Sequence, residues 1–281
     1  MFAGLPLLLW TGSGCAKEKA GTPAWIQVDS FPVTTTVEQG SRYQHFTDAW
    51  VYVNSNLVGA FELPARIPIL AEGPTEVFLY PGVQLNGLSA LRTPYLKLDR
   101  YQETLNLVPG QTTEINPTLE YDSLVQFKLV EDFENGSKFQ KSDGAYGDYL
   151  PLENAWGVAF EGQGCGYLTH NGAENTVTQM ETLDWYTLPT GDVGGIYLEF
   201  NYKCNTSFTV SLLAKTYDGL ISKIGVIGIN ATSTWKKIYI ALSPTVNSFT
   251  TGNQFKPAIG YTRQIDIATQ DLYIDNVKIL Y

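Results

Sequence analysis

The stretch Ile196-Tyr-Leu-Glu-Phe-Asn-Tyr-Lys-Cys204, followed by Phe208-Thr-Val-Ser-Leu-Leu213, decides the fold class. Its segments are rich in aromatic and β-branched residues and are joined by a short polar turn, which is the pattern of consecutive strands. Similar segments recur through residues 124–281, at 125–133, 156–160, 166–170, 223–229, 235–240, 256–261 and 272–279. Short strands at this spacing predict a two-sheet sandwich of jelly-roll size for residues 124–281.

The preceding residues, 23–121, predict a second and smaller β-sandwich. Apolar residues alternate in segments 25–31, 48–53, 57–61, 75–80, 101–107 and 112–116. Asn54-Ser55-Asn56 predicts a tight hairpin turn. Pro64 and Pro68 exclude a central strand around them, and Pro81-Gly82 predicts the end of the strand that begins at Thr75. The whole chain is therefore expected to be all-β.

The amino-acid composition limits the classes of function that the protein can have. The chain has 281 residues, of which 44% are hydrophobic and 16% charged, so it is expected to fold rather than to stay disordered. A net charge of -10 argues against nucleic acid as a partner, because phosphate backbones require basic patches.

Signals of catalysis are weak. The sequence has two histidines, and it contains no nucleophile elbow, no H-E-x-x-H motif and no phosphate-binding loop. The segment 264–270 is similar to a strand of jelly-roll glucanases but carries Gln264 and Gln270 in place of the two glutamates. Since retaining glycosidases need two carboxylates, we expect that the protein is not an enzyme.

The N-terminus predicts lipidation. Phe2-Ala-Gly-Leu-Pro-Leu-Leu-Leu-Trp10 is too short to span a bilayer but has the length of a signal-peptide core. With Thr-Gly-Ser-Gly-Cys15 behind it, it resembles the lipobox of bacterial lipoproteins, in which the cysteine becomes the acylated first residue. The resemblance implies a signal peptide over residues 1–14 and a tether over 15–22. The alternative is a buried N-terminal strand or helix that precedes a cysteine by chance.

The residues behind Cys15 imply a location. Cys15-Ala-Lys-Glu-Lys19 is similar to the export signal of surface lipoproteins of Bacteroidota. The cell-surface side of the outer membrane is therefore favoured over the periplasm, with acyl chains as a permanent anchor.

Two resemblances refine the domains. Val51-Tyr-Val-Asn-Ser-Asn-Leu-Val-Gly59 with the later Pro81-Gly82 resembles the PEGA or carboxypeptidase-regulatory-like sandwich, a spacer and docking module. Glu131-Asp-Phe-Glu134 and Tyr273-Ile-Asp275-Asn276 resemble the first and last strands of galactose-binding-like jelly rolls of the carbohydrate-binding-module type. That second family implies a structural calcium held by Glu134 and Asp275, possible supplements being Asp132 and Asp143. Otherwise these acids simply end strands in solvent.

A ligand site would need aromatic side chains beside polar ones. The candidates are Trp185, Tyr186, Tyr146 and Tyr149, and Trp185-Tyr186 stands out because it lies in a loop-like stretch. Trp156, in an alternating segment, is expected in the core. Exposed aromatic residues serve protein interfaces as well as sugars, so both uses stay open.

Cys165 and Cys204 are left over after Cys15. In an oxidising compartment they are candidates for a disulfide between strands. Two buried free thiols are an equally acceptable reading, because an unpaired cysteine packs as a small hydrophobic residue.

These features lead to two functional hypotheses. The first is a non-enzymatic surface lipoprotein that serves as an accessory or scaffold subunit of an outer-membrane β-barrel complex for uptake, secretion or barrel assembly. The alternative is a lipoprotein that captures a polysaccharide through its C-terminal jelly roll.

Overall fold

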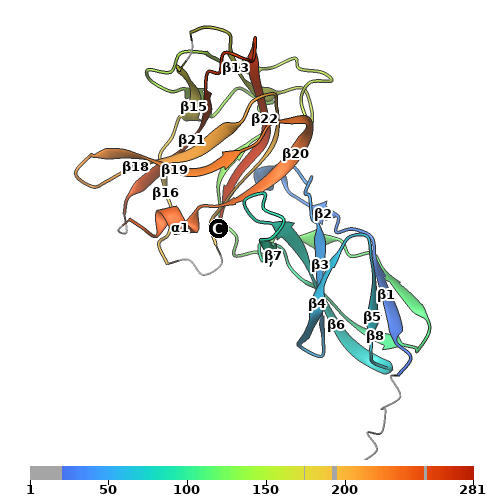
Figure 1. The fold of residues 1–281 in the computed structure, drawn as a ribbon. Coiled ribbons are helices and arrows are strands. Elements are labelled where there is room, and N and C mark those ends of the chain that lie inside the picture. The colour runs from blue at the N-terminus through green and yellow to red at the C-terminus, as the bar shows by residue number, and fades with distance from the viewer. Residues whose placement is uncertain (1–20, 174, 192–194, 250–251) are drawn as a thin grey trace, which may run out of the picture.

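The computed structural model describes residues 21–281 except residues 174, 192–194 and 250–251. The predicted signal peptide, most of the tether and Cys15 lie outside the described residues, so lipidation stays a prediction. Figure 1 shows two β domains, a smaller N-terminal one and a larger C-terminal one, packed against each other. Of the helices in the described part, none is long and apolar enough to cross a membrane.

The N-terminal domain is a small sandwich of two main sheets. One sheet has the order β5-β1-β9, and the other has β4-β3-β6-β7 with β8 also paired to β6. Their bounds are β1 Ala24–Val28, β3 Asp48–Val53, β4 Asn56–Glu62, β5 Ala65–Ile69, β6 Gly73–Gln84, β7 Arg92–Pro94, β8 Tyr101–Leu107 and β9 Thr112–Ile115. The short strands β2 (Val33–Thr34) and β10 (Leu119–Glu120) pair with each other beside a 3-10 turn, η1 (Val37–Gln39). The predicted hairpin turn is present between β3 and β4, where Asn54 and Ser55 both have positive φ.

Prolines act differently at two places in this domain. Pro68 lies on β5, an edge strand of its sheet, as its missing N–H requires. The prediction that Pro81-Gly82 ends a strand is wrong, because β6 continues to Gln84. The first residue of β8, Tyr101, lies opposite Leu79, and the last residue of β7, Pro94, lies opposite Gly82. Pro81 falls between them, where no neighbouring strand needs its N–H.

The C-terminal domain is a jelly-roll sandwich. The domain-facing sheet has the order β13-β14-β22-β17-β20 with β11 on β22, and the open sheet has β12-β15-β21-β18-β19 with β16 on β21. The domain-facing strands are β11 Phe127–Glu131, β13 Asp148–Leu152, β14 Cys165–His170, β17 Tyr197–Cys204, β20 Thr232–Ala241 and β22 Gln270–Leu280. The open-sheet strands are β12 Phe139–Lys141, β15 Val177–Thr182, β16 Tyr186–Thr187, β18 Phe208–Lys215, β19 Ile221–Ile229 and β21 Gln254–Thr262; a short helix, α1 (Ser243–Val246), follows β20. The predicted all-β fold, a small sandwich followed by a jelly roll, is confirmed.

Alternation along β17 shows how the sequence builds this sandwich. Leu198 and Phe200 point into the core between the sheets and are fully buried. Glu199 and Asn201 point to the other face, as period-two geometry requires. They are nevertheless 0% and 2% exposed, because that face meets other parts of the chain instead of water.

The hydrophobic core of the N-terminal domain extends into the jelly roll, which also has a core of its own. Tyr197, Tyr239 and Leu280 of the jelly roll belong to the buried cluster of the N-terminal domain. A bridge between Leu85 and Tyr239 and a 2.7 Å hydrogen bond from Lys278 Nζ to the Ser41 carbonyl join the domains further. The N-terminal domain is thus joined to the jelly roll by a packed interface rather than by a linker alone.

Residues 156–160, predicted as a strand, form a loop. Ala155 accepts hydrogen bonds from the N–H groups of Val158 and Ala159, which coils the chain there, and Gly157 has a φ of 75°. Trp156 is consequently 69% exposed and not in the core.

The disulfide candidate is wrong in this structure. Cys165 and Cys204 are both free and buried. They lie on β14 and β17, which flank β22 on opposite sides, so two strand spacings, at least about 10 Å, separate their Cα atoms and put them beyond the reach of a disulfide. Burial raises the pKa of the Cys165 thiol to about 12.

Candidate functional site

The outer face of the open sheet presents mainly polar and small side chains, with the apolar side chains of Val177 and Leu213 among them. We define the open face by the outward residues Gln179, Glu181, Thr209, Ser211, Lys223, Gly225, Gly228, Lys256, Ala258 and Gly260 together with Trp185. They share this side because they occupy alternate positions on paired strands: Glu181 is opposite Ala258, which is opposite Ser211, which is opposite Gly225. The open sheet has its other side in the jelly-roll core.

Small residues leave a hollow along the middle of this face. A Cβ atom added at Gly225 or at Gly228 would meet nothing within 4 Å, so the absent side chains leave open space. The hollow has a volume of about 320 Å³ and includes Ser211 and Gly260 in its lining.

Polar side chains surround the hollow. The Gln179 amide donates to Ser142 Oγ at 2.9 Å and accepts a hydrogen bond from Lys223 Nζ. Lys256 Nζ lies 3.6 Å from Glu181 Oε1, and both side chains are largely buried. These contacts hold an amide, a carboxylate and two ammonium groups in fixed positions.

Trp185 lies at one end of the open face, where β16 begins. Lys256 Nζ is 5.2 Å from the centre of a Trp185 ring and Lys215 Nζ is 5.7 Å from it, which are cation–π distances. Trp185 is half-buried, so these cations support one part of the ring while another part meets solvent.

The other predicted ligand residues, Tyr146, Tyr149 and Tyr186, do not lie together in the structure. Tyr146 is 63% exposed, and its N–H donates to the Val177 carbonyl at the end of β15 opposite from Trp185. Tyr186 and Tyr149 pack against the jelly-roll core, and burial raises the pKa of Tyr186 to about 12. The structure therefore brings Trp185 and the backbone of Tyr146 to the same sheet, while Tyr186 and Tyr149 serve mainly as packing.

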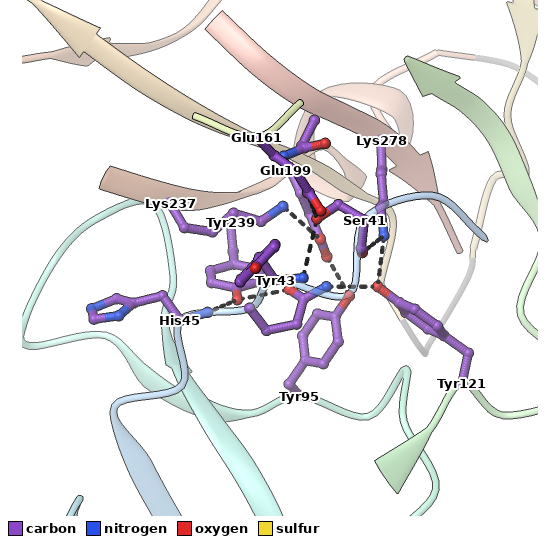
Figure 2. A network of polar contacts seen from close by, with 12 residues as sticks. Ser41, Tyr43, His45, Tyr95, Tyr121, Glu161, Glu199, Lys237, Tyr239 and Lys278 are labelled. Atoms are coloured by element: carbon purple, nitrogen blue, oxygen red, sulfur yellow. Dashed lines mark hydrogen bonds and ion pairs between the residues drawn. The ribbon is translucent and has the colours of Figure 1, made fainter. Parts of the chain in front are cut away.

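The opposite face, that of the domain-facing sheet, is a buried polar interface (Figure 2). Lys237 Nζ lies 3.7 Å from Glu199 Oε2, and Tyr95 of the N-terminal domain donates its hydroxyl to Glu199. Burial lowers the pKa of Lys237, although Glu199 acts in the opposite direction. Burial, with Glu199 adding to it, raises the pKa of Tyr95 well above its usual value.

A chain of hydrogen bonds extends this interface. The His45 N–H donates to the Tyr239 hydroxyl at 2.8 Å, and that hydroxyl donates to Gln44 Oε1 at 2.9 Å. Gln44 in turn donates to the Tyr121 hydroxyl at 2.9 Å, which lies 3.4 Å from Lys278 Nζ. Sequence reasoning missed this network, because alternation predicts outward positions without saying what covers them.

The predicted calcium ligands hold a loop instead. Glu134 Oε1 accepts from the N–H groups of Gln163 and Gly164, both at 2.7 Å. Asp275 Oδ2 accepts from the N–H groups of Phe160 and Glu161, both at 3.1 Å. Among the described residues no group of three or more His, Cys, Asp or Glu side chains is arranged to hold a metal ion. These carboxylates, occupied by backbone donors, do not fit a calcium cage, and the calcium site stays a prediction without structural support.

Comparison with known proteins gives structural likenesses. No family model matches the chain, and no curated protein matches it. A family 11 carbohydrate-binding module from Clostridium thermocellum, solved in complex with a β-1,3-1,4-mixed-linked tetrasaccharide, is 15% identical with a TM-score of 0.38, over 55% of this chain and 94% of its own. A structure described as a promiscuous carbohydrate-binding module of the β-sandwich superfamily is 15% identical with a TM-score of 0.42, over 92% of this chain and 99% of its own. The CBM22-1–GH10 modules of xylanase 10B from Clostridium thermocellum, complexed with xylohexaose, are 14% identical with a TM-score of 0.39, over 54% of this chain and 28% of theirs.

Proposed function

We propose that the protein is a non-catalytic carbohydrate-binding protein that takes a polysaccharide on the open face of its jelly roll. The observation that carries this proposal is that one sheet face holds both Trp185, at the Lys256 end of β21, and a hollow lined by Ser211, Gly225 and Gly260 farther along the same strands. An aromatic ring offers an apolar plane to the C–H side of a sugar, and the fixed groups of Gln179 and Lys223 suit its hydroxyls.

The shape of the face favours an internal part of a polymer. The hollow runs across paired strands without a wall at Gly225 and Gly228. From Lys256, beneath Trp185, to Thr262 at the far end, β21 spans about 20 Å, which accommodates several consecutive sugar units. An open groove of this kind lets a chain continue beyond the site at both ends.

The electrostatics favour a neutral polymer. Lys256 is paired with Glu181, and burial lowers the pKa of the Lys223 ammonium, although attraction to Glu181 acts in the opposite direction. Within the residues that define the open face, Glu181 is the one carboxylate, so the two-carboxylate arrangement of glycoside hydrolysis is not assembled on it.

Binding should depend on Trp185. In affinity electrophoresis against neutral plant and microbial polysaccharides, we expect Trp185→Ala to weaken binding about tenfold or more, which corresponds to about 1.4 kcal/mol. Gly225→Val, which fills the hollow and leaves the tryptophan in place, should weaken binding similarly. Trp156→Ala removes a more exposed tryptophan from another surface and should change affinity less than about twofold.

Two results would contradict this proposal. One is the absence of binding to every polysaccharide by a folded wild-type protein. The other is an equal loss of affinity in Trp156→Ala and Trp185→Ala.

We also infer that the protein acts from a lipid anchor at Cys15 on the outer surface of the outer membrane. The support is the N-terminal sequence and its likeness to lipoprotein signals. Mass spectrometry of the native protein tests it: the expected N-terminus is an acylated Cys15, and an unmodified chain that retains residues 1–14 would contradict it. The accessory role on a β-barrel complex stays a hypothesis that no contact described above favours.

A further inference from the structure

A cavity lies between the two domains, separate from the open face. It has a volume of about 490 Å³. Tyr43, His45 and Gln84 line it from the N-terminal domain, and Phe160, Asn201 and Trp235 line it from the jelly roll. The cavity therefore exists only when both domains are present.

One wall of the cavity is aromatic. The Phe160 ring lies between Trp235, with ring centres 5.8 Å apart, and Tyr43, with ring centres 5.7 Å apart, both in edge-to-face contact. Trp235 is fixed by its indole N–H, which donates to the Val158 carbonyl at 3.2 Å, and Phe160 is fixed through its backbone by Asp275. A small ring-shaped ligand would meet a preformed apolar wall here.

The floor of the cavity carries unused hydrogen-bonding capacity. Asn201 is 2% exposed, and its Oδ1 atom has no hydrogen-bond partner among the described residues. The Lys237 ammonium is paired with Glu199 only at 3.7 Å, beyond normal hydrogen-bond distance. Buried polar groups are nearly always partnered, so an acceptor and a donor left over at one cavity point to a ligand that supplies both.

The electrostatics favour a neutral ligand. Lys237 and Glu199 compensate each other, and Lys236, the other ammonium group of the lining, is exposed to solvent. A neutral molecule with several hydroxyl groups on an apolar ring satisfies the aromatic wall, the Asn201 acceptor and the Lys237 donor together.

We propose that this cavity is a second binding site, which takes one or two neutral sugar residues at the end of a glycan. The inference rests on the proposed carbohydrate-binding function but concerns a different surface. The open face lies along one sheet and is proposed to take the middle of a polymer, whereas the cavity is lined by both domains and is proposed to take a terminus. Bound there, a sugar contacts both domains at once.

The test uses free monosaccharides as probes, because they carry a terminus and cannot span the open face. Saturation-transfer NMR is recorded with the full chain and a panel of glucose, galactose, mannose, xylose, arabinose and fucose. Gln84→Trp fills the cavity from a position that lines it, and Trp185→Ala is the matched change on the open face. We expect at least one sugar to give signals that Gln84→Trp abolishes and Trp185→Ala retains.

Thermal melting and circular dichroism test whether the Gln84→Trp variant is folded. His45→Ala, which removes one side chain from the cavity lining, is a second and milder change. The proposal is overturned if no monosaccharide binds the wild type, if the signals survive Gln84→Trp, or if Trp185→Ala alone removes them. Loss of polysaccharide binding in Trp185→Ala is read separately, so the open-face proposal and the cavity proposal can fail independently.

Discussion

The two outer faces of the jelly roll arise from the same alternation of side chains, but they have different surroundings. On the domain-facing sheet, the outward residues Glu199, Asn201 and Lys278 are at most 2% exposed, because the N-terminal domain covers them. On the open sheet, the outward positions Lys223, Gly225 and Gly228 of the edge strand β19 face solvent, whereas Ser211 and Ala258 on the inner strands are 3% and 1% exposed. Alternation thus decides which side chains point away from the core. What covers each face decides whether a charged side chain there stabilises the domain interface or is available to a ligand.

The largest test of this comparison removes the buried carboxylate. Glu199→Ala leaves Lys237 buried without its counterion and Tyr95 without its acceptor, so the free energy of unfolding should fall by about 3–5 kcal/mol. The control is Glu62→Ala, which removes a carboxylate that is 76% exposed and lies 3.5 Å from Arg92. Its expected cost in urea denaturation is below about 1 kcal/mol. Equal losses in the two variants would mean that the domain-facing polar network does not hold the domains together.

A second test uses pH. Burial lowers the pKa of Lys278 to about 7, so between about pH 7 and about pH 9 the unfolded chain binds a proton here that the folded protein does not. The free energy of unfolding should therefore rise by about 1 kcal/mol per pH unit over this range, about 2 kcal/mol in all. Lys278→Met should abolish this increment, and Lys128→Met, at an exposed position of the neighbouring strand, should retain it. A slope that survives Lys278→Met would assign the effect to another group.

Below this pH range, Asp275 changes the free energy of unfolding in the opposite direction. Burial raises its pKa from 3.8 to about 7, so the folded protein binds a proton that the unfolded chain has released. This contribution lowers stability as the pH rises from about 4 to about 7. Together the two groups place a minimum of their combined stabilisation near neutral pH, which denaturation curves across this interval would detect.

A smaller effect is expected from a single hydroxyl group. Tyr239→Phe deletes the group that accepts from His45 and donates to Gln44 in the domain interface, at an expected cost of about 1–2 kcal/mol. Tyr146→Phe makes the same chemical change at a ring that is 63% exposed and should change the free energy of unfolding by less than about 0.5 kcal/mol. A negligible effect of Tyr239→Phe would show that water replaces its hydroxyl in the interface.

The smallest expected effect is that of a reductant. Because Cys165 and Cys204 are free and lie on opposite sides of β22, dithiothreitol should leave the melting temperature of a Cys15→Ser chain unchanged. A clear decrease in the melting temperature would restore the disulfide hypothesis.

Local pattern was sufficient for much of the fold. The alternation of residues 196–204 predicted β17, and Asn54-Ser55 predicted the hairpin between β3 and β4, since both depend on neighbouring residues alone. The run 156–160 failed because a backbone coil at Ala155 and the acceptors Glu134 and Asp275, distant in sequence, fix that loop. β6 passes Pro81 because two different partners divide one of its edges.

The candidate site was predicted only in part. Trp185 stood out because it lies outside the regular strands, and the structure places it on the open face. The glycines at 225 and 228, which make the hollow, carry no side-chain chemistry and gave no signal of their own. Glu199, between Leu198 and Phe200, and Lys237, next to Ile238, were the available sign of a covered face.

The position of β1 has a mechanical consequence. Residue 24, where this strand begins, lies at the end of the N-terminal domain that is farthest from the jelly roll (Figure 1). Tension between a captured polymer and an anchored N-terminus would therefore run lengthwise through the smaller sandwich and across the seam where Tyr197, Tyr239 and Leu280 are embedded. Because that seam is a continuous hydrophobic contact and not a flexible linker, the two domains would move as one rigid unit. The open face would then be held away from the membrane to which the N-terminus is anchored.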